Sequence, residues 1–250
     1  MSHKSYIAFL DILGFSEFID NTDNESASKL FKQVFRDSIG ASFFQMYQEE
    51  ISQYKLEKPR LAIVSDSIVL WTKSNTLFDF VMISQFTGLM IRNAFTAGIP
   101  LRGGIVHGSI TEMTLDEIIP GLDYFQDGIN INSSILIGKG IVNAYKLENI
   151  QNWSGCIIHE TCISHVKDSH PKALDIINMM KDGISLTEYD VPLRNGSTKN
   201  FTVINWTNSL TKELSEKDIV DSFQMHNKSI HNDSVKLKIE NTIEFYNKMK

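Results

Sequence analysis

The sequence is poor in cysteine, in long apolar runs and in positive charge. Its two cysteines, Cys156 and Cys162, lack the spacing partners of a zinc site, so we expect reduced thiols. Lysine and arginine total 24 against 30 aspartates and glutamates, which argues against a nucleic-acid polymer as partner. No apolar stretch approaches the roughly 20 residues of a membrane helix, and the N-terminus lacks a signal-peptide layout. We therefore expect a cytoplasmic protein with no membrane contact.

What is present is ordinary for a globular protein: 250 residues, of which 42% are hydrophobic and 22% charged. This length fits one domain with an elaboration. No internal repeat or low-complexity linker divides the chain. We expect a core over residues 1–150 and a C-terminal α/β extension of the same domain over residues 151–250.

Two aspartates each stand at the end of a short apolar strand. Asp11 ends the first strand and leads into a turn at Gly14, while Asp66 lies between the apolar runs 61–64 and 68–71. These runs predict a hairpin around Asp66. An ionised carboxylate at the end of a buried strand is costly unless a cation or a donor compensates it. On strands that lie side by side, the two carboxylates suit Mg²⁺ or Mn²⁺ bound to a phosphate.

Hydrophobic periodicity predicts a βαββαβ order over the first 150 residues. We expect a strand at 5–11, a helix at 25–54, the hairpin, a helix at 77–97, a strand at 101–110 and a helix at 135–149. This order is that of a ferredoxin-like α+β core with an extra helix.

The last hundred residues give weaker signals. We expect strands at 155–158 and 200–206, a short helix at 171–181 and a mostly helical tail from 214 to 250. The tail has one apolar stripe, formed by Val235, Ile239, Ile243 and Tyr246.

Four segments of the predicted core form a series: 9–15 with Asp11, 65–67 with Asp66, 99–108 with Arg102, and 138–148 with Lys146. In this order they resemble the motifs of the class III nucleotidyl cyclases. The resemblance implies a palm-type core, two Mn²⁺ or Mg²⁺ ions per active site and catalysis in a homodimer.

Some positions depart from that family's pattern. Lys146 stands where the family has a transition-state arginine, Val142 where it has an asparagine, and Ile135 where an acid reads adenine. No lysine just ahead of Asp66 is placed to read a purine. With the late segment 203–206, these features resemble the pyrimidine cyclases of the bacterial Pycsar antiphage systems. That resemblance implies conversion of UTP or CTP to the 3′,5′-cyclic monophosphate and pyrophosphate, UTP being the commoner substrate. The product then acts on a separate effector protein.

The predicted site follows from these motifs. Asp11 and Asp66 hold the metals, and the backbone carbonyl of Ile12 completes one coordination shell. Phosphate oxygens lie against backbone amides at the start of the next helix, where the helix dipole is favourable. The amides are those of Leu13, Gly14, Phe15 and Ser16. Arg102 contacts the triphosphate, and Lys146 of the partner protomer stabilises the charge that develops on the phosphates.

Structural roles remain as alternatives. Asp11 and Asp66 are also common types for a helix cap and a turn, and a lysine such as Lys146 often only offsets a helix dipole. Arg102 on a central strand favours an ion pair with an acid, and His107 a core histidine. The corresponding alternative function is a degenerate cyclase-fold module that binds nucleotide or only dimerises. A polymerase-like or dinucleotide cyclase ranks last, because the chain lacks a Gly-Gly-Asp/Glu-Glu-Phe hairpin.

Overall fold

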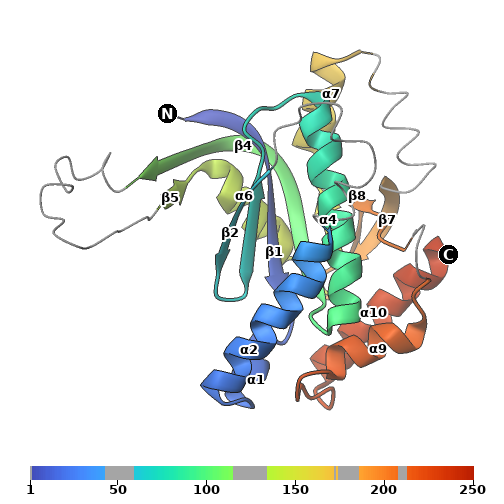
Figure 1. Cartoon of the computed structure of the whole chain (residues 1–250). Helices are drawn as coiled ribbons and strands as arrows, with labels where there is room; N and C mark the ends of the chain where they lie inside the picture. The colour runs from blue at the N-terminus through green and yellow to red at the C-terminus, as the bar shows by residue number, and fades with distance from the viewer. Residues whose placement is uncertain (1, 43–58, 115–133, 172, 174–185, 208–212) are drawn as a thin grey trace, which may run out of the picture.

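The computed structural model describes residues 2–42, 59–114, 134–171, 173, 186–207 and 213–250. In these ranges helices flank one mixed sheet (Figure 1). The strands are β1 (His3–Ile12), β2 (Arg60–Val64), β3 (Ser67–Trp71), β4 (Leu101–Thr114), β5 (Ser134–Ile137), β6 (Cys156–Ile158), β7 (Leu186–Pro192) and β8 (Thr198–Ile204). The helices are α1 (Phe15–Asp20), α2 (Asn24–Phe35), the π-helical turn η1 (Arg36–Gly40), α4 (Leu77–Ala97), α6 (Lys139–Asn149), α7 (Glu160–Ser169), α9 (Glu216–Gln224) and α10 (Asp233–Met249).

The strand order is β2-β3-β1-β4-β6-β8-β7, and β5 pairs with the far end of β4. The first four strands are mutually antiparallel, whereas β4 and β6 run parallel. An order of β2-β3-β1-β4 is that of a βαββαβ ferredoxin-like unit. The predicted α+β core is therefore confirmed, and β1 lies at its centre.

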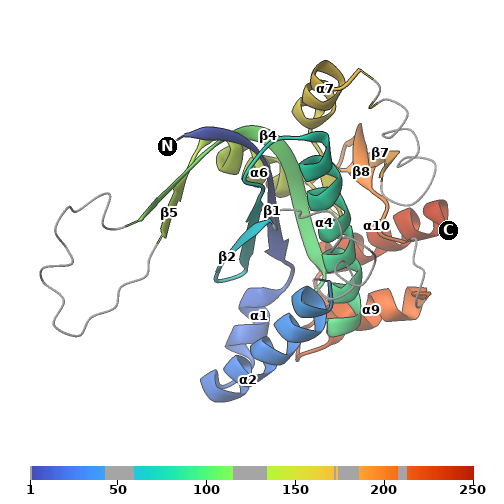
Figure 2. The same cartoon turned by 45° about the horizontal axis from the view of Figure 1, so that its top comes forward.

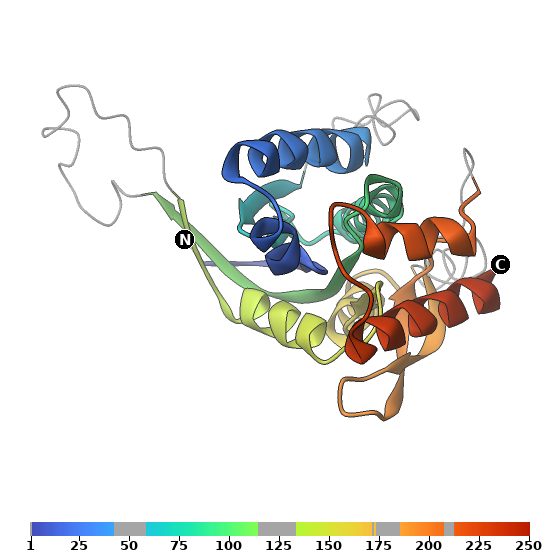
Figure 3. The same ribbon diagram turned by 90° about the horizontal axis from the view of Figure 1, so that it is seen from below.

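The two faces of the sheet have different covers. In the view from below, α1, α2 and α4 lie on one face and α6 on the other (Figure 3). On β1, Tyr6 packs on Phe80 of α4 with ring centroids 5.3 Å apart, whereas Phe9 meets Tyr145 of α6 at 5.4 Å. Because side chains alternate along a strand, Asp11 shares the α6 face with Phe9.

Helix α4 begins and ends at the predicted residues. Thr76 and Asp79 form a reciprocal capping box, and Gly98 ends the helix in the left-handed conformation. The helix is apolar on most of its surface because the sheet, η1, α7 and α9 all pack on it. Its length and direction are thus encoded locally, and its burial supplies the core.

Helix α6 lies close to β4 because the strand is rich in glycine. A Cβ atom on Gly104 would come within 2.8 Å of the Cβ atom of Leu147, a distance that real contacts do not reach. The absence of that atom lets α6 approach, which brings Glu148, the next residue of the helix, over Arg102.

The predicted helix at 135–149 is wrong at its start. Residues Ser134–Ile137 form β5, which continues the β4 hairpin, and α6 begins only after Gly138. The short apolar run before Gly138 is rich in β-branched isoleucine, which favours a strand, and Gly138 itself is extended. Helix α7 and strand β7 were not predicted at all.

Two other predictions fall partly on undescribed residues. The predicted helix at 25–54 is found as α2 and η1, and its part from residue 43 onward lies outside the described residues. The predicted helix at 171–181 also lies almost wholly outside them.

The C-terminal tail forms α9 and α10, as predicted, and α9 packs on α4 (Figure 2). The stripe on α10 faces the protein: Ile239 and Tyr246 are buried, and Val235 and Ile243 are partly buried. Among the described helices none is long and apolar enough to cross a membrane.

Candidate functional site

The two predicted carboxylates come from neighbouring strands. Asp11 of β1 pairs with Ser67 of β3, and the backbone N–H of Ile12 donates to the carbonyl oxygen of Asp66 across 2.9 Å. The β2–β3 turn that contains Asp66 therefore lies at the same end of the sheet as Asp11. The expectation that the two strands lie side by side is confirmed.

Arg102 connects this pair to α6. It stands opposite Asp11 in the β1–β4 register, and its Nη2 atom lies 3.3 Å from Oδ2 of Asp11. Its Nε donates to Oε1 of Glu148 at 2.6 Å, and its Nη1 donates to the carbonyl oxygen of Gln151 at 3.2 Å. Arg102 and Glu148 are each only 3% exposed. The guanidinium of Arg102 is thus part of an internal ion pair and positions Asp11, as the structural alternative for Arg102 predicts. The contact of Arg102 with triphosphate stays a prediction.

The charge on Asp11 is poorly compensated. Burial, and after it the charges of Glu148 and Asp66, raise the pKa of Asp11 to about 7, and Arg102 and Arg194 only partly oppose them. The contribution of Asp66 shows that the two carboxylates act on each other. A divalent cation between them would supply the missing positive charge, and this supports Mg²⁺ or Mn²⁺ as the group that fits.

The donor set is small. Within the described ranges, no group of three or more histidine, cysteine, aspartate or glutamate side chains is placed to hold a metal ion. One or two carboxylates, with water and substrate phosphates as the other ligands, is the usual arrangement for Mg²⁺ at a phosphate. Asp11 and Asp66 therefore fit a metal that arrives with its substrate better than a permanently bound one.

The turn after β1 is fixed by its own hydrogen bonds. The N–H of Leu13 donates to the carbonyl oxygen of Pro100 at 2.9 Å, so this amide already has an acceptor and is not free for a phosphate. Gly14 has a φ of +79° and makes no side-chain cap. Phe15 opens α1, so its N–H has no acceptor inside the helix. Of the predicted phosphate contacts, those from Gly14, Phe15 and Ser16 stay predictions.

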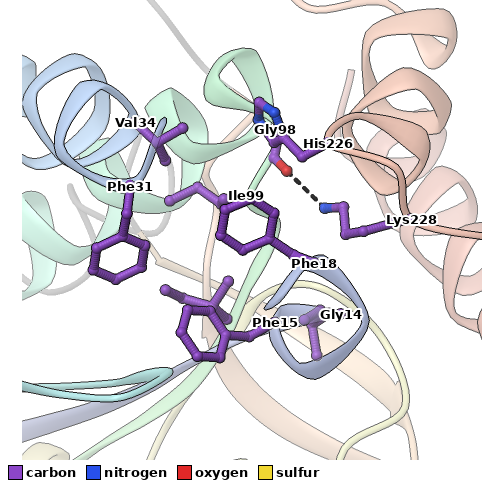
Figure 4. Close-up of a pocket in the computed structure, with 11 residues that line it drawn as sticks. Gly14, Phe15, Phe18, Phe31, Val34, Gly98, Ile99, His226 and Lys228 are labelled. Atoms are coloured by element: carbon purple, nitrogen blue, oxygen red, sulfur yellow. Dashed lines mark hydrogen bonds between the residues drawn. The ribbon is translucent and has the colours of Figure 1, made fainter. Parts of the chain in front are cut away.

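A small cavity lies behind this turn (Figure 4). Its volume of about 10 Å³ suffices for one water molecule, so it does not hold a nucleotide. Lys228, from the segment between α9 and α10, lines the cavity and donates to the carbonyl oxygen of Gly98 at 2.6 Å. The side chain of Lys228 also lies against Gly14, where a Cβ atom would be 2.9 Å from its Cδ. The C-terminal segment therefore supports the turn.

Lys146 lies outside the cluster of its own chain. Its side chain is exposed on α6, and it is not among the charges that shift the pKa of Asp11. Around it, Val142 is 50% exposed, Tyr145 48% and Ile150 40%. A catalytic role for Lys146 therefore requires a second copy of the chain that covers this apolar surface.

Sequence reasoning missed two cations that lie near Asp11. They are Arg194, in the loop between β7 and β8, and Lys238, on α10. Asp11 raises the pKa of each of them, against the larger effect of burial. The one sequence signal was that Lys238 directly precedes Ile239 of the apolar stripe on α10.

His107 lies away from this cluster. It pairs with Tyr6 and therefore faces α4, on the sheet face opposite to Asp11. Its ring stacks on His165 of α7 with centroids 3.7 Å apart. His107 is thus a partly buried packing residue, in line with the alternative that it is a core histidine.

No protein-family model and no curated protein matches this sequence. Among solved structures, the chain is similar to the catalytic core of a rhodopsin-guanylyl cyclase with converted specificity in complex with ATPalphaS, at 12% identity and a TM-score of 0.47, over 82% of this chain and 97% of that one. It is similar to the guanylyl cyclase Cya2 at 9% identity and a TM-score of 0.47, over 86% and 98%. It is also similar to a dimeric guanylyl cyclase domain of the RhoGC fusion protein from the aquatic fungus Blastocladiella emersonii, at 11% identity and a TM-score of 0.47, over 81% and 95%. These likenesses are too distant to assign an activity or a substrate.

Proposed function

We propose that this chain is a pyrimidine nucleotide cyclase, a phosphorus–oxygen lyase that converts UTP to 3′,5′-cyclic UMP and pyrophosphate as a homodimer with two Mn²⁺ or Mg²⁺ ions per active site. The observation that carries the proposal is the position of Asp11 and Asp66 at one end of the sheet, where the charge of Asp11 is only partly compensated. The order of the sequence motifs around these residues supports the same reaction.

In this proposal Asp11 and Asp66 hold the metals, aided by the carbonyl of Ile12. When bound, the two ions lower the pKa of the ribose 3′-hydroxyl and neutralise the triphosphate. Arg102 acts indirectly, because its ion pair with Glu148 and its contact with Asp11 fix the position of that carboxylate.

Lys146 has the remaining role. Negative charge grows on the α-phosphoryl oxygens and on the departing pyrophosphate, so a cation placed there lowers the barrier. Lysine provides a point charge where an arginine would provide a bidentate fork. The exposed apolar residues Val142, Tyr145 and Ile150 beside Lys146 support a second copy on this surface. Lys146 then acts on the substrate held by its partner.

The first experiment incubates the chain with UTP, CTP, ATP or GTP in Mn²⁺ and measures pyrophosphate and the mass of the product. We expect cyclic UMP, and we expect Asp11→Ala and Asp66→Ala to abolish it while the thermal unfolding transition persists. Activity retained in either variant contradicts the two-metal mechanism. If cyclic CMP is the main product, the substrate is CTP and not UTP. If none of the four nucleotides yields a product, the result supports the degenerate binding module.

A second experiment tests the shared site. Lys146→Ala and Asp11→Ala are each expected to be nearly inactive alone. Mixed as heterodimers, they contain one site with an intact Asp11 from one protomer and an intact Lys146 from the other, so partial activity should return. No recovery in heterodimers of confirmed composition would place Lys146 outside the reaction.

The biological role in the proposal is antiphage defence, in which the cyclic nucleotide acts on a separate effector protein. Its support is the sequence resemblance to pyrimidine cyclases of such systems. Cells that express the chain and its effector should survive phage challenge only when Asp66 is intact.

A further inference from the structure

Arg194 is held beside the ion-pair cluster by its backbone. Its N–H donates to the carbonyl oxygen of Ile150 at 2.9 Å, and the preceding Leu193 forms a β-bridge with Gln151. Ile150 and Gln151 directly follow α6, the helix that carries Glu148. The β7–β8 loop therefore delivers a guanidinium to the edge of the Arg102–Glu148 pair.

Lys238 reaches the same place from α10. One turn later on this helix, Thr242 accepts the N–H of Ser154 at 2.9 Å, and Asn241 donates to the carbonyl oxygen of Asn152 at 2.7 Å. Residues four apart lie on one face of a helix, so Lys238 also faces the segment that follows α6. This segment includes Gln151, whose carbonyl accepts from Arg102.

The charges of these groups act on one another. Burial lowers the pKa of Lys238, Arg102 and Arg194 lower it further, and Asp11 opposes them. Burial and then Arg102 lower the pKa of Arg194, while Glu148 and Asp11 oppose them. Two cations are thus held close together and near a third, which is unfavourable unless an anion joins them.

Neither cation has a carboxylate of its own. Within the described residues Arg194 has no side-chain ion pair, and the ammonium of Lys238 has only a 3.4 Å contact with the hydroxyl of Ser234. The nearby carboxylates already have a partner, because Arg102 pairs with Glu148 and with Oδ2 of Asp11. Lys238 is partly buried and Arg194 is exposed. A lysine and an arginine without such a partner are suited to phosphate oxygens.

We infer that Lys238 and Arg194 form a subsite, within the same protomer as Asp11, for the terminal phosphates of the nucleoside triphosphate. This inference rests on the proposed function and deepens it. It assigns a role to the C-terminal segment: α10 and the β7–β8 loop hold the pyrophosphate end of the substrate, while Asp11 and Asp66 hold the metals. The subsite selects triphosphate over monophosphate.

The test measures binding, so that it does not depend on turnover. Dissociation constants for inorganic tripolyphosphate and for UMP are measured by calorimetry in Mn²⁺ with the full chain. We expect Lys238→Met and Arg194→Gln each to weaken tripolyphosphate binding tenfold or more, about 1.4 kcal/mol, and to change UMP binding less than twofold. Lys238→Arg keeps the charge and should restore most of the affinity.

Lys236→Met is the matched control, because Lys236 lies on the same helix, is half exposed and pairs with Asp233 at 3.2 Å. It should bind tripolyphosphate like the wild type. Lys238→Met retains the apolar stem, and a thermal unfolding scan confirms its fold; Arg194→Gln repeats the test on a different element.

The outcomes separate the two proposals. Tripolyphosphate binding that is absent in the wild type, or unchanged in both variants, overturns the subsite even when cyclic UMP is formed. Weakened binding in both variants with no cyclic product from any nucleotide supports the subsite and overturns the cyclase.

Discussion

Arg102 and Glu148 form an ion pair in which both side chains are almost fully buried, and the same guanidinium reaches Asp11 at 3.3 Å. A buried pair of this kind contributes less to stability than to geometry, because desolvation of two charges offsets their attraction. Here it ties the helix α6 to the carboxylate of the proposed metal site. Loss of either partner leaves a buried charge without compensation.

Glu148→Gln should therefore lower the free energy of unfolding by about 3 kcal/mol, since it leaves the buried guanidinium of Arg102 without its main counter-charge. Urea denaturation measures the change. Glu240→Gln, an exposed position on α10, is the control and should stay within about 0.5 kcal/mol of the wild type. A change in Glu148→Gln as small as in the control would contradict a buried pair.

Asp11→Asn should stabilise the metal-free protein. Burial raises the folded-state pKa of Asp11 to about 7 from an ordinary value of 3.8, so its ionisation destabilises the fold increasingly as pH rises from 4 to above 7. At pH 8 the variant should unfold at a higher temperature, by roughly 2–4 °C per kcal/mol recovered, and at pH 4 the difference should vanish. Added Mn²⁺ should stabilise the wild type and not the variant. A variant that is less stable at pH 8 would show that the carboxylate is already well compensated.

The stacked pair of His107 and His165 should make the protein sensitive to acid. Burial, and after it His165 and Lys4, lower the pKa of His107 to about 4. Burial and Lys4 also lower the pKa of His165, which Asp168 opposes. Because the folded-state pKa is below 6.5, the neutral ring favours the fold. The stability that it contributes is complete above pH 6.5 and is lost as pH falls toward 4.

His107→Phe keeps an aromatic ring in the stack and removes this titration. The drop in melting temperature between pH 7 and pH 4.5 should be smaller in the variant than in the wild type. Equal drops in the two proteins would mean that His107 does not contribute to acid sensitivity.

Gly14→Ala should destabilise the turn after β1 for two reasons. A φ of +79° is strained for alanine, and its Cβ atom would lie 2.9 Å from the Cδ of Lys228. We expect urea denaturation to show a loss of roughly 1 kcal/mol or more, the usual cost of a strained residue. In a double-mutant cycle with Lys228→Ala the steric part should disappear and the strain part should remain. Strict additivity of the two substitutions would show that the side chains do not meet.

The core of the fold was predictable because its signals are local. Helix α4 has a capping threonine, an apolar surface and a terminal glycine in sequence, and the hairpin around Asp66 has two apolar runs at the right spacing. Residues 135–137 were wrongly predicted as helix, because a short apolar run fits a helix or a strand equally well. Only the pairing with β4 decides that these residues form a strand. Helix α7 was not predicted because only two of its residues, Cys162 and Val166, are buried, which gives a weak periodic pattern.

The site divides in the same way. The position of Asp11 and Asp66 at one end of the sheet was predictable because each stands at the end of a strand or in a turn whose signal is local in the sequence. Arg194 and Lys238 were not, because their distance from Asp11 is set by how the β7–β8 loop and α10 pack on the segment after α6. No spacing along the chain encodes that packing.

The central place of β1 has a consequence for folding kinetics. Its neighbours β3 and β4 both come from far along the chain. A long loop must therefore close before the hydrogen bonds of either strand pair can form. Domains dominated by such distant pairings fold slowly, on the scale of milliseconds to seconds. Asp11 meets Asp66 and Arg102 only when both loops have closed. The proposed metal-binding pair of carboxylates is thus assembled late, with the cooperative step that completes the sheet, and a chain with an open sheet lacks this arrangement.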